Sequence, residues 1–386
     1  MAPIKPPANE AYVGLEKYGS GSPGIGGTLK EEVGDFVVRE VTPEGLVLDL
    51  GGDVDGDLIP GDYTHFTLVK ENWDTMRAVK EISKRVGVSR NRFAFAGTKD
   101  RRAITAQRVS AYKVPVERLK EVDIKDIRLK DFCYSDENIG LGSLQGNMFT
   151  VRVRDVCEGA GEGIDAVASE LTSGFPNYYG MQRFGEVRPV THEVGLHILR
   201  GNFEGAVMCY LSKSFPAEDE GIRNLRDDLA RTRDFNTALR EFPTSLGYEK
   251  AMLNHLVQYS GDWIGAILTM PRTLQKMFVH AYQGYVFNRA LSECIRRGLI
   301  VETLPLVGLN IEADDISARV LESDGIVSGD FKVRGVSELT SRGEYRECHA
   351  VASDFKFEVG GSDVVFDFGL GKGSYATVYI REFMKN

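Results

Sequence analysis

Hydrophobic residues follow two different periodicities along this chain, and the change between them limits the folds it can adopt. Through about the first 160 residues they form short strand-like runs, and from about residue 187 they recur at the three- to four-residue spacing of helices. Few helical segments separate the strand-like runs, so we expect a mixed, largely antiparallel sheet. A strand-like run returns at 376–383. We therefore predict an α+β protein with a helix-rich block inserted into one sheet domain.

Each predicted element can be assigned to a residue range. The predicted strands are 28–41, 45–50, 63–70, 92–97, 103–112, 127–135, 148–156 and 376–383. The predicted helices of the later block are 191–211, 224–242, 249–258 and 273–298. One earlier helix is expected between an Asp74 N-cap and Gly87, with an apolar stripe formed by Met76, Val79, Ile82 and Val86. The first 25 residues are rich in Pro, Gly and Ser and are expected to follow the surface.

The composition is that of an ordinary globular protein. A length of 386 residues allows two compact domains. The sequence has no run of 18 apolar residues, which a membrane span would require. The first residues contain no apolar segment of the kind found in secretory signals. The five cysteines form no Cys-x-x-Cys pair, which favours reduced, mostly buried thiols and a cytoplasmic location. No self-complementary apolar stripe stands out, so we expect a monomer without an obligatory protein partner.

Positive charge is concentrated in one stretch of an otherwise acidic chain. The formal net charge is −9, yet the segment Lys80–Lys113 holds ten Lys or Arg residues and two acids. Charge segregated in this way can steer an anionic partner to one place. A solvated basic strand and helix face would give the same pattern, so charge alone leaves both interpretations open.

Asp100 is surrounded by cations in this basic segment, with Lys99, Arg101 and Arg102 beside it. Nearby positive charges favour the ionised form of a carboxylate. Such a group is suited to act as a nucleophile or as a fixed negative charge rather than as a general acid. The surrounding cations would bind the phosphates of a polyanion. The simpler alternative is an aspartate that caps a turn or pairs with an arginine across a strand.

Two later stretches favour recognition of a nucleic-acid base. The segment 176–185, PNYYGMQRFG, combines an amide, two tyrosines, a cation and two glycines. Asn177 can hydrogen-bond to a base edge, and a tyrosine ring can stack on a base, which contributes about 1–3 kcal/mol. The helix expected at 273–298 carries aromatic residues and an asparagine at helical spacing, and most of that stripe is interpreted as core: Phe278, Tyr282, Tyr285 and Asn288.

Patterns that would indicate a metal or an organic cofactor fail on their spacing. The glycines at 19–24 match a dinucleotide-binding fingerprint, but no hydrophobic strand precedes them and strand-like sequence follows. The aspartates at 53, 55 and 57 resemble a calcium loop without its glycine and glutamate in the required places. His192 and His197 are five residues apart, not the four that places two imidazoles on one helix face. We therefore expect neither a metal nor a cofactor.

Several of these stretches resemble the TruD family of tRNA pseudouridine synthases, in the form typical of archaea and eukaryotes. The matching runs occur in the expected order over nearly the whole chain: Thr28–Lys30, Asp35–Glu40, Ala96–Ala103, Asn177–Gly185, Gly373–Thr377 and Arg381–Glu382. The resemblance implies a pseudouridine-synthase sheet domain interrupted by a TruD-specific insertion. The expected boundaries are 1–186 and 346–386 for the catalytic domain and 187–345 for the insertion.

The resemblance also implies an activity and roles for particular residues. The expected reaction is the isomerisation of uridine to pseudouridine, at position 13 of tRNA, without a cofactor. Asp100 becomes the catalytic aspartate, which either attacks the ribose C1′ or helps to expel uracil. Lys30 becomes its basic companion and Asn177 a pocket amide. Tyr179 faces the uracil, where bacterial members carry Phe and other pseudouridine synthases carry Tyr, so the ring alone or also its hydroxyl could take part.

Further residues are expected to bind the RNA substrate. Cations of the basic segment are candidates for contacts with the RNA backbone: Lys84, Arg85, Arg90, Arg101 and Arg102. Arg183 and Phe184 of the matching 177–185 run are candidates for substrate contacts. Two alternatives use part of the same observations. A non-catalytic RNA-binding module would need only the basic segment, and a metal-dependent hydrolase would need ligand clusters that the sequence does not display.

Overall fold

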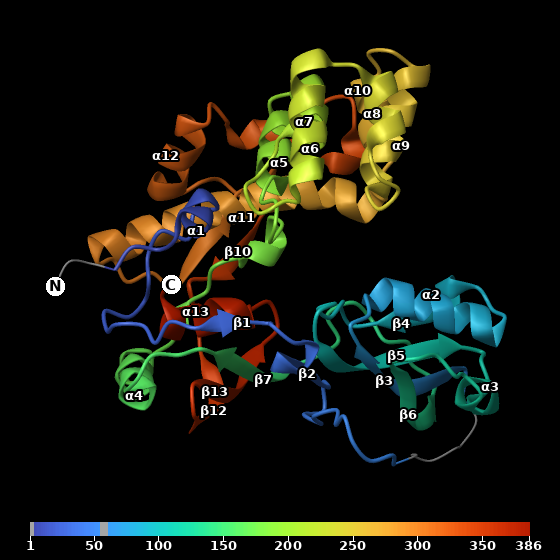
Figure 1. Cartoon of the computed structure of the whole chain (residues 1–386), viewed down its shortest axis with the longest axis vertical. Coiled ribbons are helices and arrows are strands. Elements are labelled where there is room, and N and C mark those ends of the chain that lie inside the picture. Colours follow the sequence, from blue (N-terminus) through green and yellow to red (C-terminus); the bar gives the residue numbers. More distant parts are fainter. Residues whose placement is uncertain (1–3, 55–60) are drawn as a thin grey trace. The chain divides into compact units, whose positions relative to one another are not determined.

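The computed structural model describes residues 4–54 and 61–386, and two compact units can be distinguished in it (Figure 1). The sheet unit consists of Ser22–Phe175 and Ala350–Asn386, and the helical unit of Met1–Gly21 and Pro176–His349. Two short strands, β8 (Phe175–Pro176) and β11 (His349–Ala350), mark two of the three points where the chain passes from one unit to the other, and the third lies between Gly21 and Ser22. Asp55 and Asp57 of the calcium-like pattern lie outside the described residues.

The sheet unit is built on one nine-stranded sheet within the described residues. Its strands are β1 (Thr28–Leu29), β2 (Phe36–Val41), β3 (Tyr63–Glu71), β4 (Phe93–Phe95), β5 (Ile104–Tyr112), β6 (Ile127–Ser135), β7 (Gly146–Arg154), β12 (Ala352–Gly360) and β13 (Asp363–Gly371). The main order is β12-β13-β7-β2-β5-β3-β6, with β1 paired to β7 and β4 to β5. Strands β2 and β5 pair in parallel and the other described pairs are antiparallel. The predicted α+β class with a mixed, largely antiparallel sheet is confirmed.

Helix α2 (Thr75–Val86) covers one face of β3, β4 and β5 (Figure 1). Asp74 accepts the backbone N–H of Arg77 as the N-cap, and Gly87 ends the helix in the left-handed conformation at φ 69°. The side chains on its inner face pack with Phe66, Phe93 and Val109 of the strands. Three of the four predicted core positions are buried: Val79, Ile82 and Val86. Met76 is exposed, because its position is rotated away from that face.

The remaining helical segments of the sheet unit are short. They are the 3-10 helices η1 (Val33–Asp35) and η2 (Arg90–Arg92) and the α-helices α3 (Val116–Lys120), α4 (Ala160–Glu170) and α13 (Ala376–Met384). Helix α13 corrects the predicted strand at 376–383. Its valine, tyrosine, isoleucine and phenylalanine are typical of strands, but every residue from Val378 to Met384 is buried. A helix buried on all sides has no polar face, so helical periodicity does not show in its sequence.

Two other predictions for the sheet unit differ from the structure. The segment 45–50 forms only an isolated bridge between Val41 and Val47, and its Leu46 and Val47 are exposed. The hairpin β12–β13 completes the sheet but was not predicted. Its signal was present, because Phe355, Phe357 and Val359 alternate with polar residues ahead of a Gly-Gly turn.

The helical unit contains the helix-rich block that was predicted from residue 187 onward. Its α-helices are α1 (Ala8–Tyr12), α5 (Thr191–Leu199), α6 (Phe203–Ser212), α7 (Glu220–Thr232), α8 (Phe235–Glu241), α9 (Gly247–Gln258), α10 (Trp263–Leu268), α11 (Arg272–Arg297) and α12 (Asp315–Ser323). Short elements connect and flank them: η3 (Met181–Arg183), η4 (Ser328–Phe331), η5 (Ser337–Leu339), and the paired strands β9 (Thr303–Leu306) and β10 (Glu344–Glu347).

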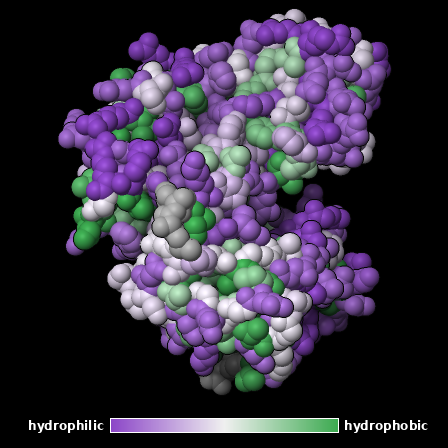
Figure 2. Space-filling view, turned by 60° about the vertical axis from the view of Figure 1, so that its left-hand side comes forward, coloured by the Kyte–Doolittle hydropathy of each residue, from purple (hydrophilic) through white to green (hydrophobic). Residues whose placement is uncertain are grey.

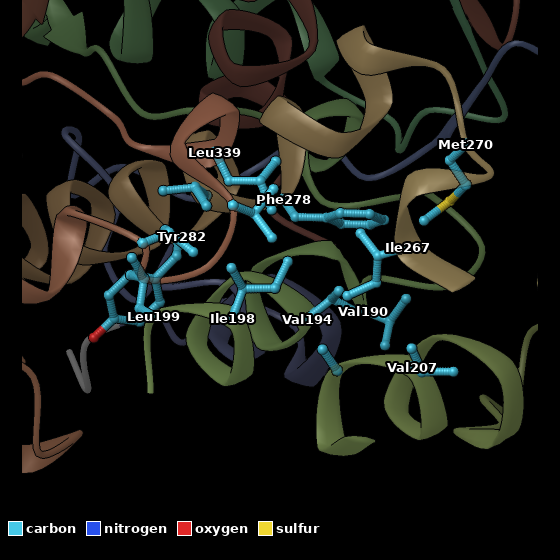
Figure 3. Close-up of a cluster of buried hydrophobic side chains, with 14 of the residues drawn as sticks. Val190, Val194, Ile198, Leu199, Val207, Ile267, Met270, Phe278, Tyr282 and Leu339 are labelled. Atoms are coloured by element: carbon cyan, nitrogen blue, oxygen red, sulfur yellow. The ribbon is translucent and has the colours of Figure 1, made fainter. Parts of the chain in front are cut away.

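Helix α11 forms the centre of the helical unit and contacts α5, α12 and β9. Figure 3 shows part of the core on it, with Phe278 and Tyr282 of α11 beside Val194 and Ile198 of α5. The two helices approach closely at Gly195, where a Cβ would lie 2.1 Å from the carbonyl oxygen of Phe278. Phe278, Tyr282 and Asn288 are buried, as expected for a stripe that serves mainly as core.

The N-terminal segment is part of the helical core, contrary to the expectation that it follows the surface. Val13 and Leu15 are buried, and the backbone carbonyl of Val13 accepts a hydrogen bond from Asn288 of α11.

All five cysteines are free, but only Cys294 and Cys348 are buried. Hydrophilic residues cover most of the face shown in Figure 2, with hydrophobic residues in small separate areas. Among the described helices, none is both long and apolar enough to cross a membrane.

Candidate active site

The predicted site residues divide into two sets, one in each unit. Lys30, Asp100 and the basic candidates lie in the sheet unit, whereas Asn177, Tyr179, Arg183 and Phe184 lie in the helical unit.

Lys30 and Asp100 are brought together although 70 positions separate them in the chain. The Lys30 Nζ lies 3.4 Å from Asp100 Oδ2, and the two side chains are 14% and 33% exposed. Lys30 follows β1 and has a left-handed backbone at φ 58°, a conformation that is uncommon for a residue with a side chain. Its ammonium also lies 4.3 Å from the centre of the Phe36 ring. The partner of Asp100 is therefore a lysine from a distant turn rather than an arginine across a strand.

A closed chain of side-chain hydrogen bonds holds the loop that carries Asp100, between β4 and β5. The backbone N–H of Lys99 donates to the hydroxyl of Thr75, at the start of α2, over 3.0 Å. That hydroxyl lies 3.0 Å from Oε1 of Gln107, and Nε2 of Gln107 donates to the carbonyl of Gly97 over 3.0 Å. Thr75 and Gln107 are fully buried, so these bonds are shielded from water. The carboxylate is thus presented on a fixed loop.

Lys70 supports the same loop from beneath. It lies in β3, is fully buried, and donates from Nζ to the backbone carbonyl of Asp100 over 2.8 Å. Burial disfavours the charged ammonium and lowers the pKa of Lys70 to about 8, although Asp100 and Asp74 act in the opposite direction. Lys70 therefore adds positive charge close to the carboxylate without occupying its oxygens.

Lys99 is turned inward and anchored by buried partners. Its Nζ lies 2.7 Å from Glu40 Oε2 in β2 and donates to Asn147 Oδ1 in β7 over 2.7 Å. Lys99 and Glu40 are only 6% and 1% exposed. The second Glu40 oxygen accepts the backbone N–H of Arg108 in β5 over 3.1 Å. The residue before Asp100 is thereby tied to three strands of the sheet.

The remaining basic candidates lie at or near the surface of the sheet unit. Lys84, Arg85, Arg101 and Arg102 are exposed. Arg102 donates to the backbone carbonyl of Glu31, close to Lys30 in the sequence, over 2.7 Å. Lys84 pairs with Glu81 one helical turn away, so part of its charge is neutralised.

Arg90 is held by local contacts. Its guanidinium donates to the sulfur of Met76 over 3.0 Å and lies 5.6 Å from the Phe95 ring centre. It is therefore the least accessible of the basic candidates.

Tyr179 lies in the helical unit between two guanidinium groups and helix α11. Its ring centre is 4.2 Å from Arg346 Cζ and 5.0 Å from Arg183 Cζ. Gly284 of α11 allows the helix to approach the Tyr179 ring, because a Cβ there would lie 3.2 Å from carbons of that ring. Asn288 accepts the Tyr179 backbone N–H over 2.8 Å and donates to its carbonyl over 3.0 Å. The ring is thus fixed from both backbone and side chain, and Tyr179 is only 6% exposed.

Asn177 and Phe184 contact protein groups that hold the segment around Tyr179 in place. The Asn177 amide is engaged on both sides, since Nδ2 donates to the carbonyl of Glu347 over 3.0 Å and Oδ1 accepts from Arg346 over 2.8 Å. Asn177 therefore orients the guanidinium that lies over Tyr179. Phe184 is fully buried and contacts the edge of the His192 ring. It anchors the 177–185 segment in the core.

Sequence reasoning missed the residues that hold the two sets in place. Glu40 and Lys70 were overlooked because each is a single charged residue in a strand-like run. A charge at an inward-facing strand position is nevertheless a signal of a buried, paired group. Arg346 lies in a segment without a recognisable pattern. Among the described residues, no group of three or more His, Cys, Asp or Glu side chains is placed to hold a metal ion.

A family model described as tRNA pseudouridine synthase D (TruD) matches residues 12–305 and 295–383 of the chain. Among curated relatives, a protein of Methanosarcina acetivorans named "Probable tRNA pseudouridine synthase D" is 33% identical over 100% of this chain and 98% of its own length. A protein of the same name from Archaeoglobus fulgidus is 35% identical over 97% of this chain and 99% of its own length.

A solved structure agrees with these matches. The crystal structure assigned to tRNA pseudouridine synthase D of Methanosarcina mazei superposes with a TM-score of 0.78 at 32% sequence identity. The superposition covers 100% of this chain and 99% of that one. The similarity therefore extends over both units and includes the Asp100 loop and the segment around Tyr179.

Proposed function

Since the chain belongs to the TruD family of tRNA pseudouridine synthases, isomerases that convert uridine to pseudouridine in tRNA, we propose that Asp100 is its catalytic aspartate and that position 13 is its target. The observation that carries this assignment is the Lys30–Asp100 pair, a partly exposed carboxylate held on a rigid loop beside an ammonium. Such a group is oriented and accessible, which a nucleophile requires.

The isomerisation moves the glycosidic bond of one nucleotide from N1 to C5 of uracil. No atom is gained or lost overall, because the proton released from C5 is balanced by one taken up at N1. Asp100 contributes its carboxylate in one of two ways. It either forms a bond to the ribose C1′ as the bond to N1 breaks, a bond that breaks again when C5 bonds to C1′, or it stabilises the positive charge that develops at C1′. The target base has to leave its stack first, at a cost of a few kcal/mol that contacts in the site offset.

Lys30 acts as the positioning residue for the carboxylate. Its ammonium, fixed by the turn after β1 and by the ring of Phe36, orients Asp100 Oδ2 and balances its charge. Lys70 holds the backbone of the same residue. Such preorganisation removes the need to rearrange the site during the reaction.

Tyr179 contributes its ring to the binding of the target uracil. We expect Tyr179→Phe to keep the single-turnover rate within about tenfold of wild type, because the contacts with Arg183 and Arg346 are made by the ring. Tyr179→Ala removes the ring and is expected to cost about a hundredfold, in line with the roughly 1–3 kcal/mol of a base-stacking contact. Rates are measured at saturating tRNA. A hundredfold loss in Tyr179→Phe would instead assign the C5 proton to the hydroxyl.

The exposed cations of the sheet unit bind the RNA backbone. We expect Arg85→Ala/Arg101→Ala to weaken tRNA binding and to lower the slope of log affinity against log salt by about one to two. Lys125→Ala/Lys356→Ala is the matched control, because it removes two exposed cations of the same unit outside the basic segment. Equal slopes for the two double variants would place the RNA path elsewhere.

One experiment tests the proposed function as a whole. The protein is incubated with unmodified tRNA transcripts in the presence of a chelator, and pseudouridine is mapped at each uridine. We propose that the protein acts without a cofactor, as a monomer and in the cytoplasm, and we expect product at position 13 in the presence of the chelator. Binding without product would indicate a non-catalytic RNA-binding protein, and cleavage that appears only with added metal would indicate a hydrolase.

A further inference from the structure

The helical unit contains a pocket around Tyr179 and Arg183, two of the predicted site residues, whose other lining residues have no predicted role. Its volume is about 390 Å³, within the roughly 300–1,000 Å³ typical of ligand sites. One side is formed by Lys276, His280 and Gln283, which lie at helical spacing on one face of α11. The opposite side is the segment Thr340–Glu344, and Tyr179, Arg183 and Leu306 complete the lining.

Gln283 fixes the wall opposite α11. Its Nε2 donates to the carbonyls of Val307 and Arg342 over 2.8 and 3.1 Å, and its Oε1 accepts the hydroxyl of Ser341 over 3.0 Å. The next residue, Gly343, donates its backbone N–H to Asn310 over 2.8 Å. Arg342 therefore projects from a backbone that is clamped on both sides, and the pocket is preformed.

Positive charge dominates the lining. Arg183, Lys276 and Arg342 contribute three cations and Glu344 one acid, and none of these four is ion-paired within the part of the chain that the structure describes. The Nε of Arg183 is buried and has no hydrogen-bond partner among the described residues. Burial of the ring, together with Arg183 and Lys276, lowers the pKa of His280, so the local field already disfavours further positive charge. An anion would relieve this repulsion.

We propose that this pocket binds a phosphate of the nucleotide next to the target uridine, with the guanidinium groups of Arg183 and Arg342 and the ammonium of Lys276 as its donors. Guanidinium groups bind phosphate oxygens through paired N–H donors, and an ammonium adds a point charge. The proposal rests on the proposed function, because Tyr179, the residue assigned to the uracil, lines the same pocket. When the target uridine is bound at Tyr179, the phosphate of the neighbouring nucleotide would be the anion that reaches the pocket.

The test compares two double variants of the full-length protein. Lys276→Ala/Arg342→Ala is expected to weaken tRNA binding about tenfold and to lower the salt slope by about one. The rate at saturating tRNA should stay within about tenfold of wild type, since Tyr179 and Arg183 are intact. The matched control, Lys332→Ala/Arg319→Ala, removes one lysine and one arginine that are exposed in the same unit outside the pocket, and it should leave affinity and slope unchanged. The charge-retaining Lys276→Arg/Arg342→Lys should recover most of the affinity.

The outcomes separate the pocket from the activity. Wild-type affinity and slope in Lys276→Ala/Arg342→Ala, with pseudouridine still formed, would overturn the pocket assignment and leave the proposed function standing. An equal loss in both double variants would also overturn it, because the effect would then be one of net charge. If the wild-type protein bound tRNA but formed no product, the proposed function would fail, while a loss confined to the pocket variant would still support a phosphate site.

Discussion

Asp100→Asn is expected to lower the single-turnover rate of pseudouridine formation by about a thousandfold or more, the scale seen when a nucleophile is removed. Asparagine has the size of aspartate but neither its negative charge nor a nucleophilic oxygen. The loop should keep its conformation, because its supporting bonds from Thr75, Gln107 and Lys70 do not use the Asp100 carboxylate. The affinity for tRNA should therefore change little, and the loss should appear in the rate at saturating tRNA.

Asp123→Asn provides the matched control for this experiment. Asp123 is an exposed aspartate of the same unit, so the substitution makes the same change of charge away from the Lys30–Asp100 pair. It should react at the wild-type rate. Residual activity of Asp100→Asn within tenfold of wild type would remove Asp100 from the role of nucleophile.

Glu40→Ala is expected to be the most destabilising of these substitutions, at about 3–5 kcal/mol of unfolding free energy. It leaves the Lys99 ammonium buried with Asn147 as its remaining hydrogen-bond partner, and it removes the acceptor of the Arg108 backbone N–H. Because Lys99 precedes Asp100, the rate of isomerisation should fall as well. The double variant Glu40→Leu/Lys99→Met removes both charges and should recover part of the lost stability, since a buried pair can be replaced by apolar groups.

The two tryptophans of the chain allow the loss of stability in Glu40→Ala to be measured in the sheet unit alone. Trp73 lies in the sheet unit and Trp263 in the helical unit. In a Trp263→Phe background, urea unfolding followed by fluorescence reports on the sheet unit through Trp73. The control is Glu81→Ala, which breaks the exposed pair with Lys84 and should have little effect. Equal midpoints for Glu40→Ala and Glu81→Ala would show that Glu40 and Lys99 do not form a buried pair.

The sequence was sufficient wherever one segment carried its own signal. The period of α2, its Asp74 cap and its end at Gly87 were all readable, as were the strands β3, β5 and β6. The charge contrast around Asp100 marked the loop, and the ordered motifs marked the family. These features depend on neighbouring residues, whose spacing is written directly in the chain.

Only the tertiary structure decided what depends on contacts between distant segments. It turned the strand-like run at 376–383 into helix α13, because burial on all sides hides the helical period. It brought Lys30, the companion that the family resemblance implied, within 3.4 Å of Asp100, and it placed Arg346 as the group that Asn177 holds over Tyr179. It also gathered Arg183, Lys276 and Arg342 around one pocket. Local patterns establish which side chains are charged, whereas the packing of remote elements determines which of those charges meet.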